Sequence, residues 1–503
     1  LSLLLIKLLK RKFSIMKNIT IIGSGLAGMS AGCYLAKNGY TVDIIDKNST
    51  CGGRLAQIKS NGFTFDKGPS WYWMPDIFEN FFKNFKKKSS DFYSLKRLSP
   101  SYQFFTETSI YQLPSNFNQL CNLFDKIDPG SSKKLELFLK SAELKYKLSI
   151  EQFLNLPGQS YSEFLKPEII KNLSKMNIFI SLRKHIRKYF SNDDIIKILE
   201  FPSMFLGGSP NNTPGVYSLM NFADIKGGTW YPKGGMYEIS KSIEKLAKDL
   251  GVKFHFNVDA KKFNVENNKI KSLVCKNNIE FTSDYFICNA EYPYVQNNLI
   301  EKKYQTYNNE YWKKCRVSPS AIIFHLGVSK KIKFLKHHNL FFDENFDEHL
   351  DDIYNKNINP KKPLFYVCCP SKTDDSVIPN DNMENLFILI PISTNTIVND
   401  ELVNFYYDYV ISKIEKYEKD LIRDNIIERI SYTKKDFVSE YNAYNGNAYG
   451  LANTLFQTAN FKPNIKDKKI KNLYYCGHFT VPGPGLPPSL ISGKIASELL
   501  MKN

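Results

Sequence analysis

The sequence predicts an α/β fold in which one parallel sheet is built from segments that lie far apart in the chain. Three observations predict it. A buried-type apolar strand at 19–22 runs directly into a glycine-rich turn and a helix of small residues. A second strand, at 41–45, ends at an acidic residue. Near the end of the chain, a strand at 473–477 is followed by a glycine- and proline-rich loop and a further helix.

The first turn has the spacing Gly-x-Gly-x-x-Gly, which is typical of a Rossmann-like dinucleotide site when a strand precedes it and a helix follows. The first glycine permits the tight turn, the second lets backbone N–H groups approach a pyrophosphate, and the third lets the helix pack closely on the sheet. The helix N-terminus adds positive dipole, and the acid after the second strand can accept from ribose hydroxyls, so FAD or NAD fits. The predicted contacts are Gly23, Ser24, Gly25, Ala27, Gly28, Asp46 and Lys47.

A second glycine pair indicates which of these two cofactors the protein binds. Gly52-Gly53-Arg54 follows the ribose acid closely, an arrangement that is not part of an NAD fold. It resembles the glycine-glycine-arginine element of the amine oxidase/phytoene desaturase superfamily of FAD proteins. The resemblance implies that Arg54 neutralises pyrophosphate charge and that the backbone at Gly68-Pro69 approaches the isoalloxazine ring.

The C-terminal loop is predicted to complete the flavin site. The last strand ends at Gly477, and a rigid loop leads to a helix that we expect to begin at Ser489. The positive end of this helix could stabilise negative charge near N1 of a reduced flavin. The predicted contacts in this loop are Gly477, Gly485, Leu486 and Pro487.

These motifs together resemble bacterial-type phytoene desaturases, which are carotenoid-forming flavoenzymes. The resemblance extends from about residue 17 to the end and includes the GGTWYPKGGM and CNAEYP segments. It implies that FAD is the cofactor, that Val258, in a strand, and Ala290 contact it, and that the substrate is a C40 polyene such as phytoene. Two departures are small: relatives more often have Glu at the position of Asp46 and Asp at the position of Glu291.

The predicted fold is therefore a discontinuous Rossmann-like FAD-binding domain with a β-sheet substrate domain and a helical, membrane-facing insert. Strands are expected at 321–328 and 386–392, and a helix is expected from residue 131. The predicted boundaries are 1–16 for a leader or upstream extension, 17–96, 227–300 and 436–503 for the FAD-binding domain, 97–226 for the helical insert and 301–435 for the substrate sheet.

One stretch of the insert bears on location. Residues 175–190 place Ile178, Phe179, Leu182, Ile186 and Tyr189 near one helical face and basic residues elsewhere. We expect a basic amphipathic helix that either faces the core or rests on anionic lipid and admits the substrate. No later segment has the uninterrupted apolar length of a spanning helix. The predicted location is the cytoplasm, in peripheral association with the membrane.

The composition excludes several classes of protein. The chain has 503 residues, 43% hydrophobic and 14% aromatic, which excludes a disordered protein. The net charge of +18 comes largely from lysine, and residue bias explains it as well as a functional surface does. No nucleic-acid recognition motif accompanies the lysines. Nine cysteines without a Cys-x-x-Cys pair indicate neither a disulfide scaffold nor a zinc site, so no metal is expected.

The expected reaction needs few polar residues. Oxidised flavin takes a hydride from an allylic carbon, and the resulting cation loses a proton, so the protein supplies an apolar tunnel and at most one weak base. We assign no catalytic residue from the sequence. Without a second dinucleotide motif, oxygen or a quinone is the expected electron acceptor. The alternatives are another carotenoid-modifying flavoenzyme (a diapophytoene desaturase, a later carotenoid dehydrogenase, a ketolase or an isomerase) and a non-enzymatic, escort-like isoprenoid binder.

Overall fold

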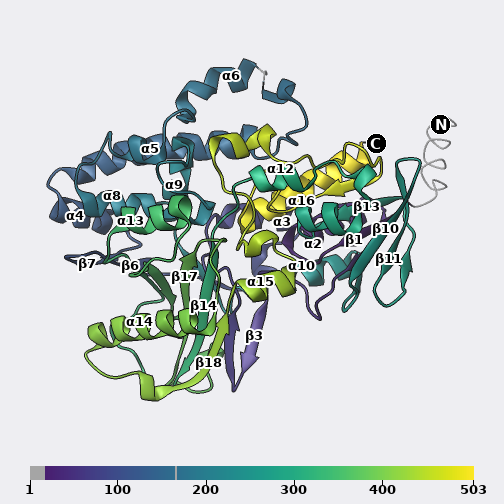
Figure 1. The fold of residues 1–503 in the computed structure, drawn as a ribbon. Helices are drawn as coiled ribbons and strands as arrows, with labels where there is room; N and C mark the ends of the chain where they lie inside the picture. Colours follow the sequence, from purple (N-terminus) through teal and green to yellow (C-terminus); the bar gives the residue numbers. More distant parts are fainter. Residues whose placement is uncertain (1–16, 165–166, 503) are drawn as a thin grey trace.

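The computed structural model describes residues 17–164 and 167–502, so the predicted leader at 1–16 lies outside the described residues. A five-stranded sheet with its helices occupies one side of the molecule, and a larger sheet with a helical layer occupies the other (Figure 1). The described helices include none that is long and apolar enough to cross a membrane.

The five-stranded sheet is parallel throughout and is assembled from four regions of the chain. Its central strand is buried on both faces, because helices pack on one face and strands β10 (Ala260–Glu266) and β11 (Lys269–Cys275) pack on the other. The strand order is β19 (Leu473–Tyr475), β13 (Tyr285–Cys288), β1 (Asn18–Ile22), β2 (Thr41–Ile45) and β9 (Lys253–His255). The helices packed together on one face are α2 (Leu26–Lys37), α10 (Tyr237–Asp249) and α16 (Leu486–Met501).

The second sheet has seven strands and is buried on both faces. Helix α14 (Asp400–Glu418) covers one face, and the helical layer covers the other (Figure 1). The predicted strands at 321–328 and 386–392 are confirmed as β14 and β17. The strand order is β18 (Ile426–Tyr432), β14 (Ser320–Val328), β17 (Glu384–Ile392), β16 (Phe365–Cys368), β15 (His338–Phe341), β6 (Tyr102–Phe105) and β7 (Ile110–Leu113).

The region predicted as a helical insert is not helical throughout. Strands β6 and β7 lie within it and extend the seven-stranded sheet, because β6 pairs in parallel with β15. The apolar side chains of β6 face both cores of that sheet, a pattern that suits an inner strand. The helix expected from residue 131 is confirmed. The helices of this layer are α4 (Phe117–Ile127), α5 (Ser131–Leu148), α6 (Pro167–Leu173), α7 (Leu182–Ile186), α8 (Asp193–Glu200) and α9 (Leu219–Ile225).

The amphipathic helix expected at 175–190 is wrong. Asn177 adopts a left-handed conformation, and Ser181 caps a new short helix, α7, through its hydroxyl. The predicted apolar face is therefore divided: Leu182 is buried, whereas Phe179 is 83% exposed. Arg183 does not face lipid either, because Glu200 and Asp347 bind it. The local capping signal at Ser181 outweighs the periodicity of the apolar residues.

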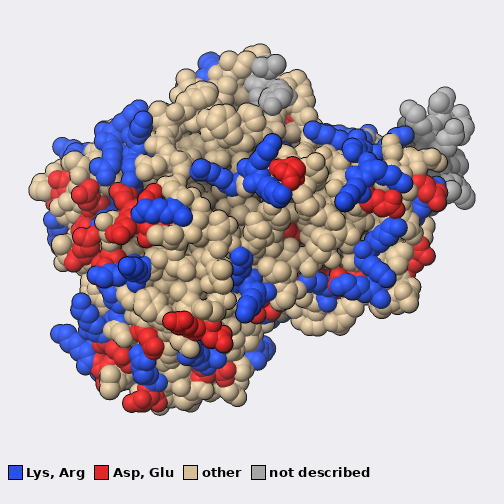
Figure 2. Space-filling view, viewed as in Figure 1, with Lys and Arg blue, Asp and Glu red and all other residues tan. Residues whose placement is uncertain are grey.

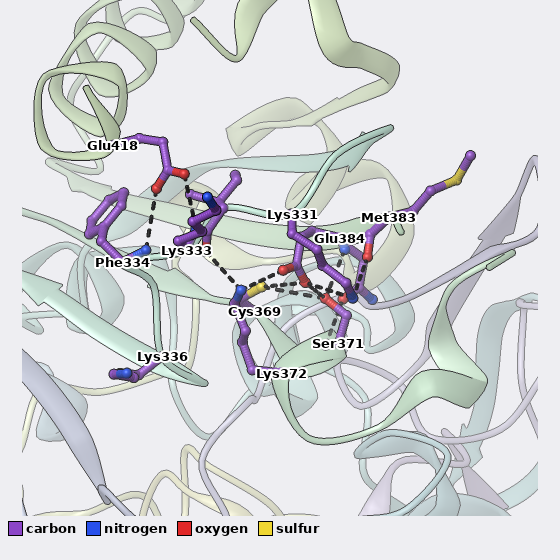
Figure 3. A network of polar contacts seen from close by, with 12 residues as sticks. Lys331, Lys333, Phe334, Lys336, Cys369, Ser371, Lys372, Met383, Glu384 and Glu418 are labelled. Atoms are coloured by element: carbon purple, nitrogen blue, oxygen red, sulfur yellow. Dashed lines mark hydrogen bonds and ion pairs between the residues drawn. The ribbon is translucent and has the colours of Figure 1, made fainter. Parts of the chain in front are cut away.

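A buried ionic network lies at the start of β17, around Glu384. The Glu384 carboxylate is fully buried and accepts from Lys372 Nζ at 2.5 Å and from the hydroxyl of Ser371 (Figure 3). Cys369 Sγ lies 3.4 Å from the same carboxylate. Its partners replace the water that the carboxylate loses on folding, so the network fixes this corner of the sheet.

The remaining elements pack on these two layers or connect them. The smaller strands are β3 (Gln57–Ser60), β4 (Phe63–Asp66), β5 (Leu95–Arg97), β8 (Trp230–Pro232), β10 (Ala260–Glu266), β11 (Lys269–Cys275) and β12 (Glu280–Phe281). The other helices are α3 (Pro75–Lys83), α11 (Tyr292–Tyr294), α12 (Asn309–Lys314), α13 (Phe346–Asp351) and α15 (Lys434–Tyr441).

Candidate active site

A cavity of about 780 Å³ lies between the two sheets. Its lining changes along its length: backbone of the glycine motifs forms one end, and aromatic and aliphatic side chains form the other. We call these the dinucleotide end and the apolar end. The dinucleotide end lies at the carboxyl ends of β1 and β2, which is where open α/β sheets bind ligands.

The glycine turn after β1 has no room for side chains. A Cβ on Gly28 would lie 2.2 Å from the carbonyl oxygen of Gly23, and a Cβ on Gly25 would lie 2.7 Å from the side chain of Asn289. Gly23 itself adopts a φ of +102°, which favours glycine. The turn therefore presents bare backbone to the cavity at the start of α2.

Asp46 lies at the end of β2 and lines the cavity. Its carboxylate accepts hydrogen bonds from the backbone N–H of Ser24 at 2.8 Å, from the Ser24 hydroxyl at 2.7 Å and from the N–H of Asn48 at 2.9 Å. Ser24 thus acts behind the cavity wall by orienting Asp46. Val258 was expected in a strand but lies in the turn after β9, where its N–H donates to the Asp46 carbonyl at 2.8 Å.

Arg54 is held by a buried carboxylate. Its Nη2 lies 3.3 Å from Glu291 Oε2, and the same oxygen is 3.0 Å from Nε2 of His478. Burial alone would raise the pKa of Glu291, but the charge of Arg54 and the contact with His478 lower it to about 2. Burial and Arg54 together lower the pKa of His478. Glu291 is therefore ionised and His478 neutral at pH 7.

The loop before α16 reaches the same cavity. Gly477 N–H donates to the Ser492 hydroxyl at 2.9 Å, which ties the end of the last strand to the helix. Helix α16 begins at Leu486, three residues earlier than expected, and includes Pro487 and Pro488 in its first turn. Proline is tolerated there because the first N–H groups of a helix have no internal acceptor.

The apolar end has walls from both sheets and from the helical layer. Trp71 and Trp73 line it, whereas Tyr72 between them is fully buried and contacts Tyr93 through its hydroxyl. Trp71 stacks on His338 with ring centroids 4.0 Å apart. Other lining side chains are Phe201, Met204, Phe205, Leu219, Met220, Ile323, Leu340, Phe342, Tyr366 and Leu389. This end suits a long hydrocarbon.

The structure brings all but two of the predicted contact residues to one cavity; Ser24 and Gly28 lie behind its wall. The lining residues include Lys47, Gly52, Gly53, Gly68, Pro69, Ala290 and Gly485. The sequence predicted no contact at Asn289, Tyr366 or His478, which also line the cavity. The Asn-Ala pair after β13 was a signal for Asn289, whereas nothing in the sequence distinguishes Tyr366 from other strand tyrosines.

The residues present fit FAD. The bare glycine backbone leaves space where a pyrophosphate would lie, and Asp46 is available to ribose. Arg54 has a buried Nε without a hydrogen-bond partner. The backbone near Gly68 and the loop before α16 also line the cavity, so both are available to the flavin.

The comparisons with known proteins identify the family of this chain. The model of the flavin containing amine oxidoreductase family matches residues 26–501. The chain is 34% identical over 490 residues to a carotenoid 3,4-desaturase of Haloarcula japonica, covering 97% of this chain and 98% of that protein. It is 28% identical over 492 residues to a zeta-carotene-forming phytoene desaturase of Myxococcus xanthus, covering 96% and 94%.

Solved structures agree in fold. A putrescine oxidase superposes with a TM-score of 0.64 at 9% identity, covering 97% of this chain and 99% of that one. An oxidoreductase from Methanosarcina mazei gives a TM-score of 0.62 at 16% identity, covering 97% and 100%. The chain therefore belongs to the flavin containing amine oxidoreductase family, as an FAD-dependent oxidoreductase of the carotenoid desaturase type.

Proposed function

We propose that the protein desaturates a C40 polyene of the phytoene type by removing a hydride and a proton from adjacent carbons. One observation supports this most strongly: a single cavity joins the dinucleotide end to a long, mostly aromatic and aliphatic end. FAD supplies the two-electron acceptor for such a reaction. The protein's side chains orient the polyene, exclude water and remove the proton.

The substrate can be tested in hosts that accumulate single polyenes. Expression in a phytoene-accumulating host should give more conjugated, coloured products, of which red lycopene-type pigment is the fullest extent. Hosts with a C30 polyene or with lycopene test the diapophytoene and later-dehydrogenase alternatives in parallel. Unchanged phytoene would contradict the phytoene assignment. A purified protein that does not bind FAD would favour the escort-like alternative.

We also propose that the protein contacts a membrane surface near the cavity, because its substrate dissolves in the bilayer. Residues 153–158, 173–178 and 455–461 all contribute to the cavity lining, and these segments and their neighbours expose large apolar side chains. Over α6 the visible surface carries few charges (Figure 2). These exposed side chains, which we call the apolar rim, are Ile170, Phe179, Phe456 and Phe461.

Removal of two rim side chains tests this contact. We expect the double variant Phe179→Ser/Phe456→Ser to co-sediment with liposomes several-fold less than the parent protein, because these side chains are 83% and 74% exposed. Ile397→Ser is the matched control, since Ile397 is 87% exposed but lies in the loop between β17 and α14, which contributes no residue to the cavity lining. Neutral and anionic vesicles show whether lysines add attraction. Equal liposome binding by the double variant and by Ile397→Ser would contradict the proposal that the apolar rim contacts the membrane.

The electron acceptor is proposed to be oxygen or a quinone, because the sequence contains one dinucleotide motif and FAD would occupy it. The rate at which reduced protein is reoxidised by dissolved oxygen, by a soluble quinone and by a nicotinamide separates these acceptors. Fast reoxidation by the nicotinamide alone would contradict the proposal.

A further inference from the structure

Two titratable side chains form a hydrogen-bonded pair in the wall of the apolar end. Tyr366 lines the cavity, and its hydroxyl lies 2.6 Å from Nδ1 of His338 and 3.0 Å from the hydroxyl of Ser70. The two residues come from neighbouring strands in which His338 pairs with Cys368, so Tyr366 is its diagonal neighbour on the same face. Two antiparallel strands thus fix the geometry.

The pair is uncharged at neutral pH. Burial raises the pKa of Tyr366 and lowers that of His338, so the proton between them resides on the tyrosine oxygen and Nδ1 accepts it. The described titratable groups next to His338 are Tyr366, His337 and Cys368. His337 and Cys368 are also neutral, because burial lowers the pKa of His337 and raises that of Cys368. Nδ1 is therefore a free base one hydrogen bond away from the cavity.

We infer that Tyr366 and His338 together accept the proton released in the desaturation. The inference rests on the proposed function. One C–H bond breaks with its electron pair leaving as hydride to the oxidised flavin. The adjacent C–H bond then breaks, its electrons form the new C=C bond, and its proton goes to the Tyr366 oxygen. The original hydroxyl proton moves to Nδ1 of His338, so the charge lost by the substrate cation appears on the imidazole.

Trp71 is placed to stabilise the positive charge on the His338 imidazole. Its ring lies 4.0 Å from the His338 ring with an interplanar angle of 9°, so an imidazolium would lie over the negative face of an indole. The contact favours the charged imidazole in a buried position where solvent cannot. The contact from Ser70 holds the Tyr366 hydroxyl in place. Water that enters after product release can then remove the proton.

Flavin reduction in one anaerobic turnover tests the inference. Tyr366→Phe keeps the ring and removes the proton carrier. Because the substrate cation takes its hydride back unless its proton is removed, we expect net flavin reduction to be 10²- to 10⁴-fold slower. FAD content and polyene affinity should not change. Deuterium at the carbon that loses the proton should slow the variant more than the parent protein. Tyr406→Phe is the matched control, because Tyr406 is fully buried and its hydroxyl donates to the Pro360 carbonyl, but it does not line the cavity.

A second measurement does not need turnover. In protein labelled with ¹⁵N-histidine, the His338 signal should show an unprotonated Nδ1 that accepts a hydrogen bond and should shift in Tyr366→Phe. A protonated Nδ1 would overturn the inference. So would a stoichiometric metal ion, because His337, His338 and Cys368 offer ligand atoms within 4.8 Å of one another. Equal flavin reduction in Tyr366→Phe and parent protein would overturn this inference alone, whereas a parent flavin that no polyene reduces would overturn the proposed function with it.

Discussion

The two ends of the cavity differ in how the chain builds them. The dinucleotide end consists largely of backbone from short, continuous motifs such as residues 23–28 and 52–54. The apolar end consists of side chains from many elements, including β14, β16 and the helical layer. Backbone recognition requires glycine at fixed positions, whereas an apolar wall accepts many residues of similar volume. The first end should therefore be intolerant of small changes and the second tolerant.

The largest expected effect comes from Gly28→Ala. The added methyl group would lie 2.2 Å from the Gly23 carbonyl oxygen, which is backbone and cannot move aside. We expect the purified variant to contain no FAD, as measured by absorbance near 450 nm. Gly39→Ala is the control, because nothing lies within 4 Å of its added methyl group although its φ is +85°. Normal flavin content in Gly28→Ala would show that the turn can rearrange.

The next effect compares two buried carboxylates. Glu291→Gln and Glu384→Gln each leave a cation without its partner, so we expect both to lower the free energy of unfolding by about 3–5 kcal/mol. Only Glu291 lines the cavity, so only its variant should also bind FAD more weakly. Urea denaturation and flavin titration measure the two quantities. A loss of FAD affinity in Glu384→Gln would mean that the two regions are coupled.

Two buried acids, Glu291 and Asp224, should change the stability of the protein with pH in opposite directions. The pKa of Glu291 falls from 4.5 to about 2, so its contribution is present above pH 4.5 and is lost as pH falls towards 2. Burial raises the pKa of Asp224 from 3.8 to about 6, so its contribution is present at low pH and is lost as pH rises from 3.8 through 6. Glu291→Gln and Asp224→Asn should each remove about 2–3 kcal/mol of variation from their own window. Melting temperatures of each variant and of the parent protein from pH 2 to 8 test this. A variant whose melting temperature varies with pH as the parent's does would contradict it.

The smallest expected effect is at the apolar end. Ile323→Val removes one methylene from the cavity wall, so we expect a loss of about 0.5–1.5 kcal/mol in the free energy of unfolding and unchanged FAD content. The ratio of products in a polyene-fed assay should change measurably, although the loss of stability is small. Loss of flavin in this variant would show that the wall is less tolerant than we infer.

The same contrast explains what the sequence could predict. Gly23, Gly25 and Asp46 were predictable because their residue types follow from the geometry of a strand, a turn and a helix. The pair of Tyr366 and His338 was not, because only the pairing of β15 with β16 brings them together. The error at 175–190 has a similar cause: apolar periodicity predicts a helix, but it does not show where Asn177 and Ser181 interrupt it.

The strand order of the parallel sheet has a consequence for biosynthesis. The sheet begins with β1 but is completed only by β19, and α16 then packs on α2, which follows β1 directly. A ribosome must therefore synthesise more than 400 further residues before the first glycine turn gains its last neighbours. Until then the apolar faces of β1 and α2 are incompletely covered. Cofactor capture is thus a late event, and a chain interrupted before residue 473 should not retain FAD.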